Sequence, residues 1–117
     1  MQKILIIVHA APYGSERCLS ALRLANALIA LETPPRLELF LMSDATIAGL
    51  PNQQDGDSNG LQGMIETLVE AGVPIRLCRT CALARGIAQL ELIPGVAIGT
   101  LPELAQSTLS ADKVITF

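Results

Sequence analysis

Short runs of consecutive apolar residues, separated by longer amphipathic segments, limit what this chain can fold into. Ile4 to Val8 is an uninterrupted aliphatic run, and Leu37 to Met42 is nearly all apolar. Such runs are typical of strands that are buried on both faces, as in parallel sheets. Shorter apolar runs at residues 75–77, 96–98 and 114–117 predict three further strands.

Helical patterns lie between these runs. Residues 15–31 carry leucine and alanine at helical spacing behind Ser15, which suits an N-cap. Residues 61–69 place apolar side chains at i, i+3, i+4, i+7 and i+8, and Gly72 suits the end of that helix. Thr100 to Glu103 is a capping-box pattern that begins a helix reaching residue 109.

Two short helices complete the pattern. One is expected over residues 45–48, where Ser43 and Asp44 can act as caps, and the other over residues 81–87. The polar stretch between Gly49 and Gly60 is the candidate mobile loop.

Strands and helices alternate along the whole chain, and each connection between strands is long enough for a crossover. With 117 residues, the chain has room for one domain and not for two. We therefore predict a single α/β domain over residues 1–117, a three-layer α/β/α sandwich with a five-stranded, mostly parallel sheet. Half of the residues are hydrophobic, so helices cover both faces of the sheet, or subunits bury one another, or both.

Charge and hydropathy narrow the range of partners. The net charge of -3 argues against direct binding of nucleic acid. No apolar run approaches the roughly 18 residues that span a bilayer, and Ile4 to Val8 is too short for the core of an export signal. We therefore expect a cytoplasmic protein without membrane contact, in which the three cysteines stay reduced.

Ligands of parallel-sheet proteins bind at the carboxyl ends of the strands, and the segment from Ile75 to Cys81 falls at that edge. The dinucleotide, phosphate-loop and G-x-S-x-G motifs that often occupy this edge are absent. Cys78 lies where a strand ends and a helix is about to begin, between Arg76 and Arg79. Positive charge and a helix N-terminus both favour a thiolate. We therefore predict that Cys78 is the reactive group and that its pKa is lowered.

Other interpretations of the cysteines stay open. A free cysteine is most often a small buried hydrophobe, and this is the expected role of Cys18. Cys78 and Cys81 form a C-x-x-C, which also suits a thiol–disulfide couple. Cys81 alone could be a resolving thiol, a second sulfur site or a packing residue. His9 and the three cysteines do not have the spacing of a zinc site, so we expect neither a metal nor another cofactor.

The groups expected to stabilise the thiolate or to line a pocket around it come from three segments at the same sheet edge. They are Arg76, Arg79, Thr80, Cys81, Tyr13, Ser43 and Asp44.

Several segments resemble the DsrE/DsrF-like family: residues 9–16, 39–45, 77–81, 98–101 and 109–117. The resemblance runs from the first strand to the last residue. It implies a three-layer subunit and a homohexamer built as a trimer of dimers. Other members of the family form sulfur-relay assemblies that serve tRNA thiolation or sulfur oxidation, in which a cysteine at the end of the third strand carries persulfide sulfur. Cys78 occupies that position here.

The expected function is therefore that of a sulfur carrier or sulfurtransferase-like protein. It would hold a persulfide on Cys78 and pass the sulfur between a donor and an acceptor protein. A thiol–disulfide redox protein that uses Cys78 and Cys81 is an alternative. A non-enzymatic oligomeric binding module with structural cysteines is another.

Overall fold

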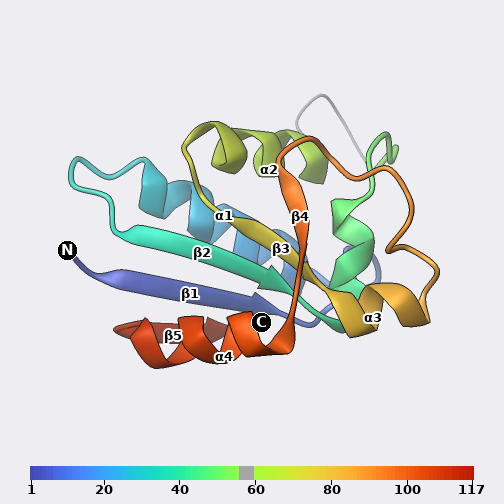
Figure 1. Cartoon of the computed structure of the whole chain (residues 1–117). Coiled ribbons are helices and arrows are strands. Elements are labelled where there is room, and N and C mark those ends of the chain that lie inside the picture. The colour runs from blue at the N-terminus through green and yellow to red at the C-terminus, as the bar shows by residue number, and fades with distance from the viewer. Residues whose placement is uncertain (56–59) are drawn as a thin grey trace.

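A computed structural model describes residues 1–55 and 60–117 of the chain (Figure 1). Its strands are β1 (Lys3–Val8), β2 (Arg36–Leu41), β3 (Ile75–Cys78), β4 (Val96–Gly99) and β5 (Lys113–Thr116). They form one sheet in the order β4-β3-β2-β1-β5, and each neighbouring pair is parallel. The predicted α/β fold with a five-stranded sheet is confirmed, and the sheet is parallel throughout the described residues.

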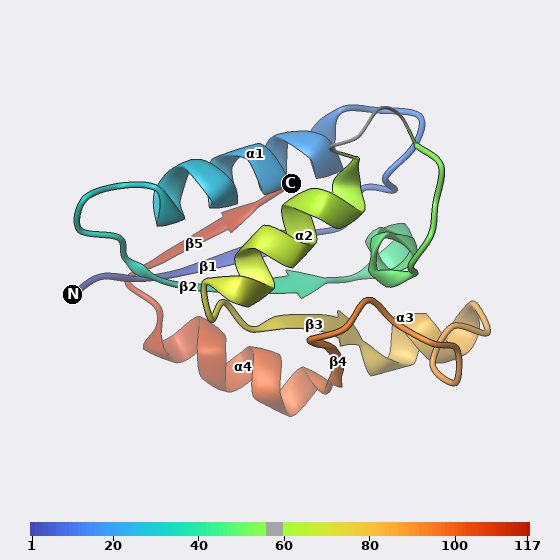
Figure 2. The ribbon, with the colours of Figure 1, turned by 90° about the horizontal axis from the view of Figure 1, so that it is seen from above.

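Helices cover both faces of this sheet. They are α1 (Arg17–Ile29), the 3₁₀ helix η1 (Ser43–Gly49), α2 (Leu61–Glu70), α3 (Arg79–Ala84) and α4 (Leu101–Ser110). Two views at right angles show α1 and α2 together on one side of the sheet and α4 on the other (Figures 1 and 2). None of the helices within the described residues has the length and apolar character needed to cross a membrane.

The two faces of the sheet bury different sets of side chains, because neighbouring residues of a strand point to opposite faces. Most of the core lies on the side of α1 and α2, where Ile6, Leu39 and Leu77 are almost completely buried. The side of α4 holds a smaller buried cluster of Leu5, Phe40 and Cys78. The predicted reactive thiol therefore belongs to the smaller core.

Helix α1 begins one residue later than predicted. Glu16 is its N-cap residue and makes no side-chain capping bond. Ser15 lies one position farther out, where its Oγ accepts a long bond of 3.4 Å from the N–H of Arg17. The prediction that Ser15 is the N-cap is therefore wrong by one residue.

The predicted caps of η1 are also wrong. Met42 is the N-cap residue, and no side chain caps this helix. Ser43 has a φ of 53°, so it starts the helix in a left-handed conformation, and its carbonyl accepts a hydrogen bond from Thr46 Oγ1 at 2.8 Å. The carboxylate of Asp44 instead accepts a bond from Arg85.

The C-terminal capping box is present as predicted. Thr100 Oγ1 accepts a bond from the N–H of Glu103, and the Glu103 carboxylate accepts one from the N–H of Thr100. Helix α3 starts directly after β3, earlier than the predicted residue 81, which places Thr80 and Cys81 in its first turn.

The predicted loop between Gly49 and Gly60 is described in part, since residues 56–59 lie outside the described residues. Hydrogen bonds hold the part of the loop before residue 56 in place: Gln53 Nε2 donates to the carbonyls of Ile47 and Leu50 at 2.7 and 3.0 Å. Asp55 accepts a bond of 3.0 Å from the first N–H of α2.

Candidate functional site

Cys78 is the last residue of β3 and the N-cap residue of α3. Its side chain is 1% exposed and packs with Leu5 and Phe40, which come from the neighbouring strands β1 and β2. Five partly buried side chains border the cluster: Ile7, Met42, Cys81, Leu104 and Ala111. The sulfur therefore lies at the carboxyl edge of the sheet but beneath side chains of the α4 face.

Two opposing influences act on the Cys78 thiol. Burial is the stronger one and raises the pKa of Cys78 above its usual value. The backbone N–H groups of Cys81 and Thr80, in the first turn of α3, lower that pKa because their positive ends favour a thiolate, although the Cys78 side chain makes no capping hydrogen bond in this structure. The Cys81 thiol adds to the increase. The net direction is upward, contrary to the lowered pKa expected from the sequence.

The arginines do not reverse this balance, because acidic side chains lie beside two of them. Arg76 lies on the same sheet face as Cys78, and its Nε is 3.9 Å from Glu103 Oε2. Arg85 Nε donates to Asp44 Oδ1 at 2.9 Å, and another nitrogen of the same guanidinium donates to the Cys81 carbonyl at 3.1 Å. The sequence has no acidic residue between Glu70 and Glu91, but the fold brings Glu103 and Asp44 next to the arginines of this stretch.

Arg79 and Thr80 occupy the first two positions of α3, and both side chains are exposed. Thr80 acts on Cys78 through its backbone N–H. The predicted role of Thr80 near the sulfur therefore has a geometric basis in its main chain, whereas Arg79 makes no such contact in the described residues.

Glu103 is a residue of this region that sequence reasoning missed. One carboxylate oxygen accepts bonds from the backbone N–H and hydroxyl of Thr100 at 2.9 and 3.0 Å, and the other faces Arg76. The Thr100 bonds, and to a smaller degree the charge of Arg76, lower the pKa of Glu103. The capping-box pattern identified the first role, but no sequence signal pointed to the second.

Tyr13 and the η1 residues are held by other partners. The Tyr13 hydroxyl donates to Gln53 Oε1 at 2.6 Å, and the ring is half exposed. Desolvation, and next the charge of Asp55, raise the pKa of Tyr13. Asp44 approaches the C-x-x-C indirectly, through Arg85 and the Cys81 carbonyl. The structure thus brings Arg76, Thr80 and Cys81 to Cys78, while Tyr13 and Ser43 make their described contacts elsewhere.

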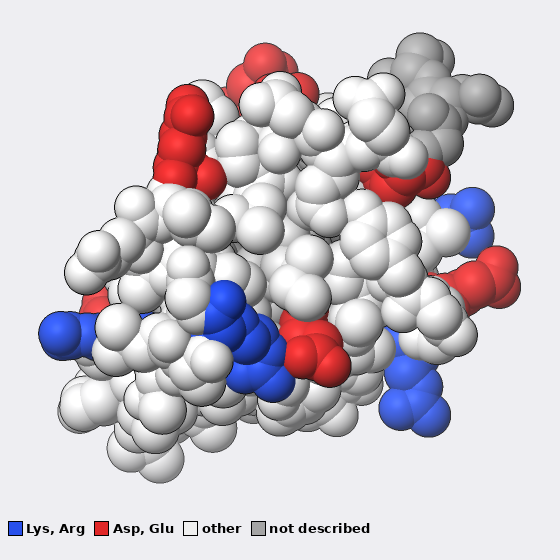
Figure 3. Space-filling model, turned by 90° about the vertical axis from the view of Figure 1, so that its right-hand side faces the viewer, with Lys and Arg blue, Asp and Glu red and all other residues white. Residues whose placement is uncertain are grey.

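The surface above this sheet edge is mostly uncharged, and a few acidic and basic groups stand out on it, some of them side by side (Figure 3). Among the described residues, no group of three His, Cys, Asp or Glu side chains is arranged to hold a metal ion. Cys78 and Cys81 are both free thiols, and Cys81 packs against the buried cluster that contains Cys78. The chemistry that this arrangement supports is nucleophilic attack by one sulfur beside a second thiol.

Comparisons with known proteins agree with the geometry. The family model described as the DsrE/DsrF-like family matches residues 2–117. Protein YchN of Escherichia coli (strain K12) is 56% identical over 117 residues, with all of both chains covered. The crystal structure of the E. coli ychN protein has a TM-score of 0.95 to this chain, again with full coverage of both. The resemblance found in the sequence is thereby confirmed.

More distant relatives extend the comparison. Sulfurtransferase TusD of Pectobacterium atrosepticum is 32% identical over 127 aligned positions, which cover 96% of each chain. A protein of unknown function from Methanobacterium thermoautotrophicum has a TM-score of 0.79 at 16% identity, with full coverage of both chains, and shares the fold. The family match over nearly the whole chain and the full-length relatives lead to one conclusion: this protein is a member of the DsrE/DsrF-like family.

Proposed function

We propose that the protein is a sulfur carrier that holds a persulfide on Cys78. The observation that supports this most directly is the position of the Cys78 sulfur, which faces the backbone N–H groups of Thr80 and Cys81 at the end of β3. A sulfur anion at this point would be stabilised by the positive ends of these N–H groups. The similarity to a protein named sulfurtransferase TusD supports the same class of chemistry, the transfer of sulfur.

The transfer has two balanced steps. The Cys78 thiolate attacks the outer sulfur of a donor persulfide, the new S–S bond forms on Cys78, and the donor leaves as a thiolate. An acceptor thiolate then attacks the outer sulfur of the Cys78 persulfide and releases the Cys78 thiolate. No net oxidation occurs in either step.

Burial of Cys78 means that a donor must first reach the sulfur. Helix α4 is the movable part of the cover in this proposal, because none of its residues is fully buried although Leu104 contacts the Cys78 cluster. A helix with so little buried surface opens at a small cost in free energy. The raised pKa of Cys78 in the closed form keeps the thiol protonated and unreactive until the helix moves.

Exposed apolar side chains on α4 and β5 support the proposal of a homo-oligomer. Leu101 and Leu109 of α4 are 50% and 83% exposed, and Val114 of β5 is 42% exposed. Exposed apolar side chains on neighbouring elements are typical of subunit interfaces. We propose that subunits associate through this side, in the homohexamer of three dimers that the resemblance implies. A reducing, cytoplasmic setting would keep the three thiols free.

Intact mass spectrometry after treatment with a sulfane donor such as inorganic polysulfide tests the carrier. Wild-type protein is expected to gain one sulfur atom, reversed by a thiol reductant, and Cys78→Ser is expected to gain none at that site. Cys18→Ser is the matched control and should label like wild type. Equal labelling of wild type and Cys78→Ser would refute the proposal.

A thiol–disulfide couple is the second candidate, favoured by the packing of the free Cys81 thiol against the cluster that contains Cys78. In that case the two thiols would lose two electrons and two protons to an oxidised dithiol and form one disulfide. Titration in dithiothreitol buffers with thiol trapping would then show a reversible two-electron transition that Cys81→Ser abolishes. If Cys81→Ser instead accepts sulfur normally and wild type forms no disulfide, this candidate is excluded.

A further inference from the structure

A cavity of about 340 Å³ lies at the sheet edge opposite Cys78. Its walls come from the amino ends of β1 and β2, the proline turn before β2, the turn before β3 and the end of α4. Its volume is near the lower end of the range for small-molecule sites, which is about 300–1,000 Å³. It is distinct from the proposed sulfur site, since it lies beside Lys3 and Arg36 and not at the carboxyl ends of the strands.

Two cations lie side by side in this cavity. Lys3 and Arg36 are direct partners in the parallel register of β1 and β2, so their side chains leave adjacent strands on one face, about 4.8 Å apart at the backbone. Like charges in such positions repel one another and reduce stability. Among the residues that the structure describes, the ion pairs are Arg76 with Glu103 and Arg85 with Asp44, so neither Lys3 nor Arg36 is in one.

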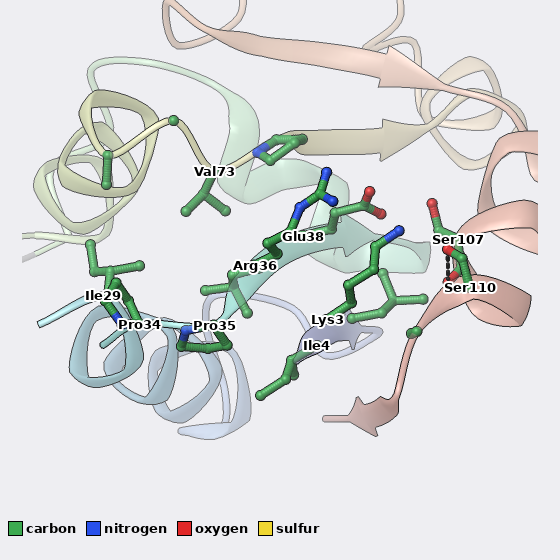
Figure 4. A pocket seen from close by; sticks show the side chains of 16 residues that line it. Lys3, Ile4, Ile29, Pro34, Pro35, Arg36, Glu38, Val73, Ser107 and Ser110 are labelled. Carbon is green, nitrogen blue, oxygen red and sulfur yellow. Dashed lines mark hydrogen bonds between the residues drawn. The ribbon is translucent and has the colours of Figure 1, made fainter. Parts of the chain in front are cut away.

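Glu38 is the third charged group of the cavity. It follows Arg36 by two residues on the same face of β2. Figure 4 shows the charged ends of Lys3, Arg36 and Glu38 pointing into the same space, between Val73 on one side and Ser107 on the other. The three groups together carry one net positive charge. A ligand with a single negative charge would neutralise this net charge, whereas a multiply charged anion such as phosphate would leave an uncompensated negative charge beside Glu38.

The remaining lining is aliphatic or small. Ile29, Pro34, Pro35 and Val73 form an apolar side, and none of the lining residues is aromatic. Such a surface suits a short aliphatic chain, because it offers burial of CH₂ and CH₃ groups without a ring for stacking. The guanidinium of Arg36 matches the geometry of a carboxylate, to which it can donate two parallel hydrogen bonds.

We infer that this cavity binds a small aliphatic monocarboxylate. The carboxylate would lie between Lys3 and Arg36, and the hydrocarbon part would lie against Val73 and the proline turn. Glu38 would act as the selectivity residue, because its negative charge repels a second negative charge on the ligand.

Isothermal titration calorimetry of the full chain with isovalerate tests the inference. Saturable binding is expected for isovalerate and not for isovaleramide, which has the same size but no charge. Arg36→Gln should weaken isovalerate binding about tenfold or more, since a charged hydrogen-bonding partner is lost. Arg23→Gln, on the exposed side of α1, is the charge-matched control and should bind like wild type.

Two further variants separate shape from charge. Ser107→Leu should abolish binding because the larger side chain fills the cavity, and circular dichroism should show an unchanged fold. Glu38→Gln should bind inorganic phosphate more tightly than wild type does. Absence of saturable isovalerate binding, equal affinity in Arg36→Gln, or preference of the wild type for phosphate would each overturn the inference. Sulfur loading of Cys78 is measured separately, so a failure here leaves the proposed function unaffected.

Discussion

Burial of the Cys18 thiol should make the unfolding free energy of the protein depend on pH. Cys18 lies on α1, is 1% exposed, and burial raises its pKa from 9.0 to about 11. The folded state therefore keeps the Cys18 proton to higher pH than the unfolded state does. A raised folded-state pKa gives stability that is complete below the unfolded-state pKa and is lost as the pH rises toward the folded-state pKa. The relevant window extends from about pH 9 to pH 11.

The magnitude follows from the two pKa values. Near pH 10 the unfolded thiol is about nine-tenths ionised and the folded one about one-tenth, which removes roughly 1.3 kcal/mol of unfolding free energy relative to pH 8. Such a loss is a substantial part of the total of about 5–15 kcal/mol typical of a domain. Cys18→Ala lacks the titrating group, so its stability should not include this loss.

Urea unfolding of both proteins, followed by far-ultraviolet circular dichroism in a phosphine reductant, measures the effect. Protein concentration is held fixed, since subunit association would otherwise change the apparent stability. Loss of the sulfur atom lowers the unfolding free energy of Cys18→Ala by an amount that does not depend on pH. The other titrating groups are common to both chains. The stability gap between wild type and variant should therefore shrink by about 1.3 kcal/mol between pH 8 and pH 10. A gap that stays constant across this range would show that burial does not control the Cys18 pKa.

Two pairs of substitutions test the packing of the fold. Gly95 has a φ of 94°, and a Cβ there would overlap the Val69 side chain. Gly95→Ala should therefore cost at least about 2 kcal/mol of unfolding free energy. Gly86→Ala should cost less, because Gly86 has a φ of 69° but open space around the position of a Cβ. Leu77 is fully buried and Leu83 is 55% exposed, so Leu77→Ala should cost about 2–5 kcal/mol and Leu83→Ala should cost much less. Urea unfolding measures all four variants, and equal costs within either pair would contradict the packing described here.

The sequence was sufficient to predict the parts of the fold that depend on local patterns. The uninterrupted aliphatic run from Ile4 to Val8 forms a strand inside the sheet, between β2 and β5. The Thr100–Glu103 capping box formed as predicted because its partners are three residues apart. At α1, Ser15 and Glu16 are adjacent polar residues, and the pattern could not decide which of them precedes the first helical turn.

The electrostatics of the candidate site could not be predicted in the same way, because the groups involved are distant in the sequence. Arg76 faces Glu103, which is brought to β3 by the packing of α4. Cys78 is buried by Leu5 and Phe40, which are separated from it by several elements. The prediction of a lowered thiol pKa counted the charges along the chain, whereas burial, the largest influence on that pKa, depends on the tertiary structure.

Helix α4 connects the two sites that the structure suggests. Its Leu104 contacts the Cys78 cluster, and Ser107 and Ser110, one and two turns farther along, line the cavity at the opposite edge. A carboxylate that binds the cavity only while α4 is docked must stabilise the docked helix. Because the docked helix also covers Cys78, the same ligand must stabilise the closed cover by the same free energy. Alkylation of Cys78 by iodoacetamide should therefore slow as isovalerate saturates the protein, and it should be unaffected by isovalerate in Arg36→Gln. An unchanged rate in the wild type at saturation would show that α4 does not move as one unit.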